Sequence, residues 1–224
     1  MKPSTADDRQ VFHFTHVDHL DGIIDSGLQC DLLIRGDGPL TMEAGHQTIK
    51  ERRRRRVVTC SPGGVVADYV PFYFAPRSPM LYLITNPHQW STGGVATFEG
   101  SARELIYLVT SIRRLMSEGC SLVLTDRNAV LGIAEFSTDH ERWFTDGFID
   151  WPLMKEKVWK NTAEYPDRKE CRMAECLAYQ SVPWRAIAEV VVRDEEVGRR
   201  VQRILDSHGE ERFVPRVERD WYFK

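Results

Sequence analysis

Apolar residues in this chain of 224 residues gather in short segments, each bounded by turn or helix-capping residues. Short segments rich in β-branched and aromatic residues predict strands. The candidate strands are Val11–Val17, Val70–Ala75, Leu105–Thr110, Leu122–Leu124, Ile133–Phe136, Glu175–Tyr179 and Val190–Val192. They are unevenly spaced, and few helices separate them. This pattern favours an α+β fold with a central, mostly antiparallel sheet over a doubly wound parallel sheet.

Helix signals stand between several of these strands. Asp18 is a candidate N-cap for a helix that ends at Gly27, and Ser78-Pro79 is a helix start. Other helices are expected at His46–Arg56, Ile112–Glu118, Pro152–Trp159 and Glu195–Leu205. Residues 29–45 contain three glycines and a proline and predict a long loop. Loops of this length in compact domains are often functional.

Composition and charge exclude several classes of protein. No apolar run approaches the roughly 20 residues that span a bilayer, and the polar segment Met1–Gln10 lacks the apolar stretch of a signal peptide. Lys and Arg number 30 against 33 Asp and Glu, so any nucleic-acid contact must come from a local patch. The five cysteines have no CxxC spacing, which predicts neither zinc nor a disulfide framework. We therefore expect a protein of the reducing cytoplasm without a membrane anchor or a metal.

The chain has no internal repeat and no low-complexity linker, so we expect residues 1–224 to form a single domain. The first strand is not followed by GxGxxG, and GxxxxGK[ST] does not occur. The two common nucleotide-binding motifs are therefore absent.

Two segments hold residues that could bind a ligand. In the first strand, His13 and Thr15 share one face and His16 lies on the other, although a strand histidine is more often a hydrogen-bonded core or edge residue. The segment 68–78 contains four aromatic residues, and it ends in Pro-Arg-Ser. That ending is unusual for packing alone, and Arg77 would suit a phosphate.

Arg52–Arg56 are five consecutive arginines. Such a run is usually a solvated face or a nucleic-acid patch, and here it could bind a phosphate backbone. In a helix, the 100° step per residue distributes five side chains around the whole circumference. At least one must then face the protein, where an unpaired arginine is costly. We therefore expect one arginine of the run to point toward a site.

Glu175 stands at the start of an apolar strand, directly after Ala174. A carboxylate in this place is either salt-bridged to the nearby Arg168 or Arg172, or held in a site. The residues alone leave both interpretations open. No local signature supports a Ser-His-Asp or Cys-His arrangement.

Together, four segments between Phe12 and about Trp184 resemble the DarT family of DNA ADP-ribosyltransferase toxins. These segments are Phe14–Val17 with Leu20 and Ile23, Ile49-Lys50 with the arginines, Gly63–Met80, and Arg172–Glu175. The third is long and nearly unbroken. The resemblance implies the ADP-ribosyltransferase fold, a split mixed sheet with a cleft for NAD. Tyr73-Phe74-Ala75 and a following serine are also similar to the nicotinamide pocket of poly(ADP-ribose) polymerases.

The resemblance also implies roles at the NAD cleft, where NAD is the donor of ADP-ribose. His16 would bond the adenosine ribose, and the main chain of Val17 the nicotinamide amide. Tyr73 would offer its ring to nicotinamide, and Ser78 its hydroxyl to the amide. Arg77 is assigned to the pyrophosphate by its charge and position. The 29–45 loop would lie over the NAD.

Catalysis is assigned to Glu175 and Arg53. Glu175 would stabilise the oxocarbenium-like charge that develops on the ribose. The acceptor would be a thymine ring nitrogen in single-stranded DNA. Arg53 would favour the deprotonated base, with Glu175 positioned to take the proton. Counting from Ile49-Lys50 selects Arg53, with Arg52 and Arg54 as the next choices.

The resemblance further implies how DNA and a partner protein are bound. The other arginines of the run would contact DNA phosphates: Arg52, Arg54, Arg55 and Arg56. The segment Trp159–Arg172 would contact the acceptor. A bacterial cytoplasmic toxin of this kind has a DarG macrodomain antitoxin as its partner, which removes the mark.

Two rival interpretations remain at this point. One keeps the fold and changes the acceptor to RNA, protein or guanine. The other is a non-catalytic module that binds single-stranded nucleic acid through Arg52–Arg56. The module would bind in a salt-sensitive way without Glu175 or NAD, and the net charge of −3 argues against it.

Overall fold

The computed structural model describes residues 8–34, 47–86, 102–145 and 147–223. Within these ranges, eight strands form one sheet in the order β10-β9-β4-β1-β3-β7-β5-β6, and β2 pairs with β8 in a small second sheet. Of the strand pairs formed by the described residues, only β10–β9 is parallel. The strands are β1 (Gln10–His16), β2 (Leu28–Gln29), β3 (Tyr69–Tyr73), β4 (Leu105–Ser111), β5 (Leu122–Thr125), β6 (Phe136–Ser137), β7 (Glu175–Tyr179), β8 (Ser181–Val182), β9 (Glu189–Val192) and β10 (Arg216–Val217). The predicted α+β fold with a mostly antiparallel sheet is confirmed.

The main sheet is split between β1 and β3. β1 pairs with β4 over its whole length, but only Phe12 and Tyr73 are in register between β1 and β3. Pro71 lies in the middle of β3 and has no N–H, and its carbonyl accepts a hydrogen bond from the His13 side chain at 2.8 Å. A proline removes a ladder hydrogen bond, so the two strands diverge here.

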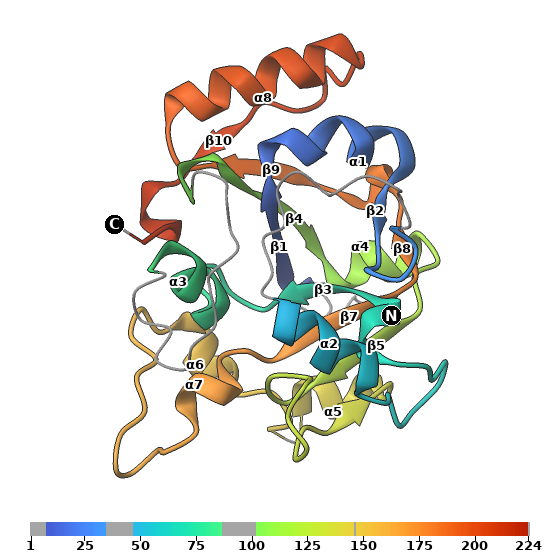
Figure 1. The fold of residues 1–224 in the computed structure, drawn as a ribbon, viewed down its shortest axis with the longest axis vertical. Coiled ribbons are helices and arrows are strands. Elements are labelled where there is room, and N and C mark those ends of the chain that lie inside the picture. The colour runs from blue at the N-terminus through green and yellow to red at the C-terminus, as the bar shows by residue number, and fades with distance from the viewer. Residues whose placement is uncertain (1–7, 35–46, 87–101, 146, 224) are drawn as a thin grey trace.

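Helices and short 3₁₀ turns surround the sheet. In Figure 1, α8 lies over the β9–β10 end, α5 lies at the opposite end, and α2 crosses in front of β3 and β7. The helices are α1 (Leu20–Ser26), α2 (Gln47–Arg55), α3 (Pro79–Thr85), α4 (Ile112–Ser117), α5 (His140–Thr145), α6 (Trp151–Lys155), α7 (Arg168–Cys171) and α8 (Glu195–Ser207). The turns are η1 (Val17–His19), η2 (Val66–Asp68), η4 (Ala102–Glu104), η5 (Trp184–Ala186) and η6 (Arg219–Trp221). None of the helices in the described ranges has the length and apolar character needed to cross a membrane.

The two faces of the sheet are covered by separate apolar clusters. β4 shows the alternation that a strand buried on both faces requires, because Ile106 and Leu108 pack in one cluster and Tyr107 in the other. The first cluster includes residues of α1, α4 and α8, and the second includes residues of α3 and the C-terminal segment around Tyr222. β1 therefore packs in both clusters, through Val11 and Phe12, whereas β3 packs in the first through Val70 and Phe72.

Three local predictions were wrong. Asp18 does not cap α1, because its N–H donates to His16 Nδ1 at 3.2 Å and the N-cap position falls on His19. The strand predicted at Ile133–Phe136 begins only at Phe136, since the chain before it forms consecutive turns and leaves Ile133 71% exposed. The helix predicted at Pro152–Trp159 ends at Lys155, where the next residue adopts an extended backbone.

The remaining predictions mostly agree with the structure. The helix start at Ser78-Pro79 and the helix ending at Gly27 are confirmed. α2 confirms the helical arginine segment. Most of the loop predicted at 29–45 lies outside the described residues.

Candidate active site

A cavity of about 540 Å³ opens where β1 and β3 diverge. This volume is within the range of about 300–1,000 Å³ that is usual for small-molecule sites. Residues of β1, β3, α1, α2 and the first turn of α3 line it. They are His13, Phe14, Thr15, Asp18, His19, Gly22, Ile23, Ser26, Gly27, Leu28, Gln29, Asp31, Ile34, Ile49, Lys50, Arg53, Pro71, Tyr73 and Met80.

Glu175 lies next to this cavity and is bound through both carboxylate oxygens. Its Oε2 accepts a hydrogen bond from Arg53 Nη1 at 2.8 Å, and its Oε1 accepts one from the Ala129 N–H at 3.2 Å. Glu175 is 1% exposed and Arg53 is 9% exposed. Tyr73, which lines the cavity, is directly opposite Glu175 in the β3–β7 register. The expectation that one arginine of the run points inward is therefore confirmed, and that arginine is Arg53.

The partner of Glu175 is not one of the two nearby arginines that the sequence suggested. Arg172 is buried, but it donates to the carbonyls of Leu153 and Pro76, both at 2.9 Å. Arg168 donates to the carbonyl of Val158. These main-chain acceptors occupy the two guanidinium groups, so the ion pair of Glu175 is made across the fold with Arg53.

The Arg53–Glu175 pair determines the charge state of its surroundings. Burial by itself would lower the pKa of Arg53, but the Glu175 carboxylate more than offsets this and raises it. Burial raises the pKa of Tyr73 far above its ordinary value, and the negative charge of Glu175 adds to the shift. At neutral pH Arg53 therefore keeps its positive charge, and Tyr73 stays a neutral phenol.

Two histidines of the cavity are held in the neutral form. Burial lowers the pKa of His13 and of His19. His13 Nδ1 must carry its proton, because its partner at 2.8 Å is the carbonyl of Pro71, which can only accept. Thr15 Oγ1 lies 2.9 Å from His19 Nδ1. Both rings can therefore take part in neutral hydrogen bonding to a ligand.

The other arginines of the run differ in exposure. Arg52, Arg54 and Arg55 are exposed, as a role in DNA binding would require. Arg56 is half-buried, and its guanidinium donates to the carbonyls of Ala129, Gly132 and Ala134. Arg56 is thus already bound to the protein.

The residues that the sequence assigned to NAD differ in whether they line this cavity. Tyr73 lines the cavity, whereas His16 and Val17 are fully buried at the end of β1, immediately before Asp18, which does line it. His16 Nδ1 is 3.3 Å from the Asp18 carboxylate. The hydroxyl of Ser78 caps α3 by accepting a hydrogen bond from the N–H of Leu81. Of this set, only Tyr73 faces the cavity directly.

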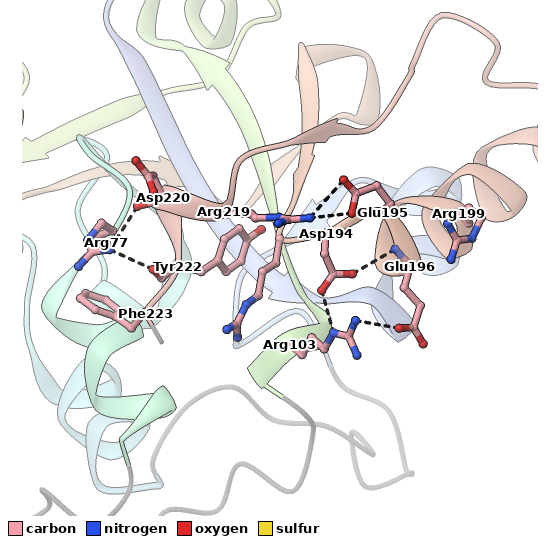
Figure 2. Close-up of a pocket in the computed structure, with 11 residues that line it drawn as sticks. Arg77, Arg103, Asp194, Glu195, Glu196, Arg199, Arg219, Asp220, Tyr222 and Phe223 are labelled. Carbon is pink, nitrogen blue, oxygen red and sulfur yellow. Dashed lines mark hydrogen bonds and ion pairs between the residues drawn. The ribbon is translucent and has the colours of Figure 1, made fainter.

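Arg77 lies in a second cavity, of about 620 Å³, and not in the one beside Glu175. Its Nη1 donates to the carbonyls of Asp220 and Tyr222, and its guanidinium lies 4.4 Å from the centre of the Phe223 ring (Figure 2). These contacts bind the side chain to the C-terminal segment and place Arg77 outside the cavity beside Glu175, while its assignment to the pyrophosphate stays a prediction. The backbone at Arg77 has a φ of +55°, which marks a sharp turn between β3 and α3.

Ion pairs dominate the rest of the second cavity. Arg103 pairs with Asp194 and Glu196, and Arg219 pairs with Glu195, as Figure 2 shows. The carboxylates at the start of α8 thus compensate the charges of Arg103 and Arg219, two of the arginines that line this cavity.

Sequence reasoning missed several residues of the first cavity. His13 and Thr15, on one face of β1, both line the cavity, although a histidine in a strand is more often a core or edge residue. Lys50 stands in the Ile49-Lys50 motif, to which the sequence assigns no binding role, and it lines the cavity. The donor at Ala129 is a main-chain N–H, for which the sequence has no signal. Among the described residues, no group of three or more His, Cys, Asp or Glu could hold a metal ion.

A family model described as ssDNA thymidine ADP-ribosyltransferase, DarT, matches residues 12–223. The chain belongs to the DarT family. A DNA ADP-ribosyl transferase of Thermus sp. (strain 2.9) is 36% identical over 226 residues, which covers 100% of both DarT chains. The buried Glu175–Arg53 pair therefore lies in a DarT fold, beside the cavity where β1 and β3 diverge.

Solved DarT structures have the same fold as this chain. Thermus sp. 2.9 DarT in complex with ADP-ribosylated ssDNA aligns with a TM-score of 0.83 and 33% identity, covering 100% of both chains. The same protein in complex with NAD⁺ aligns with a TM-score of 0.79 and 32% identity, covering 97% of this chain and 98% of that one. The predicted ADP-ribosyltransferase fold is thereby confirmed.

A more distant DarT relative is joined to a second enzyme. The DNA ADP-ribosyl transferase–DNA ADP-ribosyl glycohydrolase fusion protein of Thermosipho africanus is 22% identical over 199 residues. The match covers 89% of this chain and 46% of the fusion protein. This chain therefore spans about half of that protein.

Proposed function

We propose that this chain transfers ADP-ribose from NAD to a thymine base in single-stranded DNA and releases nicotinamide. The observation that supports this most directly is the buried pair of Glu175 and Arg53 beside the cavity between β1 and β3. A carboxylate and a guanidinium that are buried and fixed beside a cavity are suited to a reaction in which positive charge develops on one reactant and negative charge on the other.

In the proposed reaction, the bond between nicotinamide and ribose breaks, and nicotinamide leaves with the bonding electrons. The negative charge of Glu175 stabilises the positive charge that remains on the ribose. A ring nitrogen of thymine then forms the new bond to the same ribose carbon. Arg53 stabilises the base as it loses its ring proton, and Glu175 accepts that proton. The products are nicotinamide and an ADP-ribosylated base, with one proton released.

For the donor, we propose that the cavity between β1 and β3 holds NAD. Tyr73 offers its ring to nicotinamide, and His16 and the main chain of Val17 bond the ribose and the amide from the end of β1. Ser78 keeps its proposed contact to the amide through the hydroxyl hydrogen that its capping bond leaves available. For the pyrophosphate we propose Lys50, a cation that lines this cavity, in place of Arg77.

For the acceptor strand, we propose that Arg52, Arg54 and Arg55 contact DNA phosphates from the exposed face of α2. The partner that removes the mark would be a DarG-type macrodomain protein, which the fusion protein of Thermosipho africanus supports, since it joins the transferase to a glycohydrolase. Such a toxin would act in the cytoplasm, where both NAD and DNA are available.

The test is to incubate the protein with labelled NAD and oligonucleotides that each contain one type of base. We expect label on the thymine oligonucleotide only. Glu175→Gln keeps the size of the side chain and one oxygen that can accept from Arg53 or from Ala129, but it removes the charge. Transfer should therefore fall by about 10²–10³-fold while NAD binding persists. Glu211→Gln, a change at an exposed carboxylate, is the matched control and should leave the rate unchanged.

The same experiment can contradict the proposal. Label on guanine, on RNA or on the protein itself would show that thymine is not the acceptor. Transfer by Glu175→Gln at the parent rate would remove the catalytic role of this carboxylate. Salt-sensitive DNA binding without any transfer would favour a non-catalytic binding module.

A further inference from the structure

The chain between β5 and β6 forms a tight structure that holds Glu175. The N–H of Leu131 donates to the carbonyl of Asn128, and the N–H of Ala134 donates to the carbonyl of Leu131. We call residues 128–134 the carboxylate-holding turn. Its Ala129 N–H donates to Glu175 Oε1 at 3.2 Å. The position of this turn therefore determines where one oxygen of the carboxylate lies.

Arg56 binds this turn at both ends. Its Nε donates to the carbonyl of Ala129 at 3.3 Å, and its Nη2 donates to the carbonyls of Gly132 and Ala134 at 3.2 and 3.0 Å. The guanidinium also lies 5.3 Å from the centre of the Phe136 ring, where β6 begins. A planar guanidinium with five donors in a fixed arrangement can satisfy three carbonyls at once, which the single ammonium of lysine does not reproduce.

Arg53 and Arg56 are three residues apart, so their side chains leave α2 and its end on neighbouring positions of one face. Arg53 binds Glu175 Oε2 directly, and Arg56 reaches Oε1 through Ala129. The main chain of Arg56 is fixed as well, because its N–H donates to the carbonyl of Arg52 and its carbonyl accepts from the N–H of Val66. One helical segment thus controls both oxygens of the carboxylate.

Building on the proposed function, we propose that Arg56 is a positioning residue for Glu175 and not a contact for DNA phosphates. Its donors are committed to the carboxylate-holding turn, whereas Arg55, its neighbour, is exposed. Arg56 acts through the turn and touches neither NAD nor DNA.

The test compares Arg56→Lys with Arg203→Lys in steady-state transfer to a thymine oligonucleotide. Both variants keep the positive charge, but Arg56→Lys loses the three-carbonyl contact. Misplacing a reacting group by about 1 Å can cost about 100-fold in rate. We therefore expect Arg56→Lys to lower kcat about tenfold or more, with the KM for NAD and for DNA unchanged. Arg203→Lys, at an exposed arginine of α8 that has no proposed role in binding or catalysis, should leave all three values near those of the parent.

Arg56→Ala and Arg55→Ala complete the comparison. The first should lower kcat further without raising the KM for DNA, and the second should raise that KM without lowering kcat. In a Glu175→Gln background, Arg56→Lys should have little further effect, because the carboxylate it positions is no longer charged. A parent-like kcat in Arg56→Lys, or an equal fold-loss in the two backgrounds, would overturn the inference.

The parent protein separates this inference from the proposed function. If the parent fails to label any oligonucleotide, the proposed function is wrong. If the parent labels thymine and Arg56→Lys does so at the same kcat, only the role of Arg56 is wrong.

Discussion

Glu175 and Arg53 are separated by 122 positions in the chain, and both are almost inaccessible to solvent. Burying two charges costs several kcal/mol in desolvation, and their attraction often does no more than compensate for it. Removing one partner is worse, at about 3–5 kcal/mol, because the other charge stays buried and unpaired. The pair is therefore better explained by the reaction than by stability, and Glu175→Gln is a cleaner test than Glu175→Ala.

Gly27 is a residue whose identity the backbone requires. It ends α1 with a φ of +78°, and a Cβ here would lie 2.5 Å from the carbonyl oxygen of Val182 in β8. Gly63 also has a positive φ, of +86°, but a Cβ there would meet nothing within 4 Å. Both glycines thus have a positive φ, but only at Gly27 would a Cβ also collide with a neighbouring atom.

We expect Gly63→Ala to lower the free energy of unfolding by about 1–2 kcal/mol, the cost of a left-handed conformation. Gly27→Ala should lower it clearly more, because a main-chain oxygen in the small sheet would have to move. Urea denaturation of both variants measures the difference. Equal losses would show that the contact with Val182 is unimportant.

At the scale of elements, the divergence of β1 and β3 produces the cavity. Pro71 removes a main-chain donor, and the His13 side chain takes the place of a strand partner by binding the Pro71 carbonyl. β1 remains paired with β4, and β3 remains paired with β7. The loss of pairing is therefore confined to the contact between β1 and β3. The cavity therefore forms between two neighbouring strands of one sheet, without breaking the order of its strands.

The His13 contact predicts a pH dependence of stability. Burial lowers the pKa of His13 in the folded protein, whereas in the unfolded chain it is about 6.5. Below about pH 6.5 the unfolded chain therefore binds a proton that the folded state does not, and the free energy of unfolding falls as the pH falls. The loss from this one group is at most about 1.4 kcal/mol per pH unit, and it vanishes above that range.

His13→Asn preserves a donor for the Pro71 carbonyl and cannot titrate. Between pH 7.5 and 5.5 we expect the Tm of the parent to fall more than the Tm of this variant. The carboxylates are common to both proteins, so their contribution cancels in the comparison. Parallel losses of Tm would mean that His13 titrates normally in the folded state.

At the scale of the whole molecule, two cavities lie on either side of the turn between β3 and α3. Met80 at the start of α3 lines the cavity near Glu175, and Arg77 lines the second one with Tyr222 and Phe223. Arg77 also receives support from Trp159, whose Nε1 donates to its carbonyl. The turn therefore connects the candidate NAD site with the C-terminal segment.

NAD at 100 times its Kd should raise the stability of the protein by about 2.7 kcal/mol, which is measurable as a rise in Tm. Lys50→Ala should reduce this rise, since Lys50 lines the proposed NAD cavity. Arg77→Ala should lower the Tm without NAD, because it frees the C-terminal segment, but keep the rise with NAD. The opposite result, a rise lost only in Arg77→Ala, would restore Arg77 as the pyrophosphate residue.

The sequence by itself determined the local features of this protein. The alternation and length of apolar segments predicted most strands, and Ser78 and Gly27 marked helix ends because capping and positive φ depend on single residue types. Five consecutive arginines on a helix required one to face the protein, and Glu175 was recognisable as a carboxylate at the start of a buried strand.

Only the tertiary structure decided which of these groups meet. Arg53, and not Arg168 or Arg172, pairs with Glu175, and Arg77 faces away from the cavity to which its charge had assigned it. Such contacts depend on strand register and on the path of loops between distant segments, which no local pattern encodes. The main-chain N–H of Ala129 is the extreme case, because every residue except proline has that donor and only the fold aims it at Glu175.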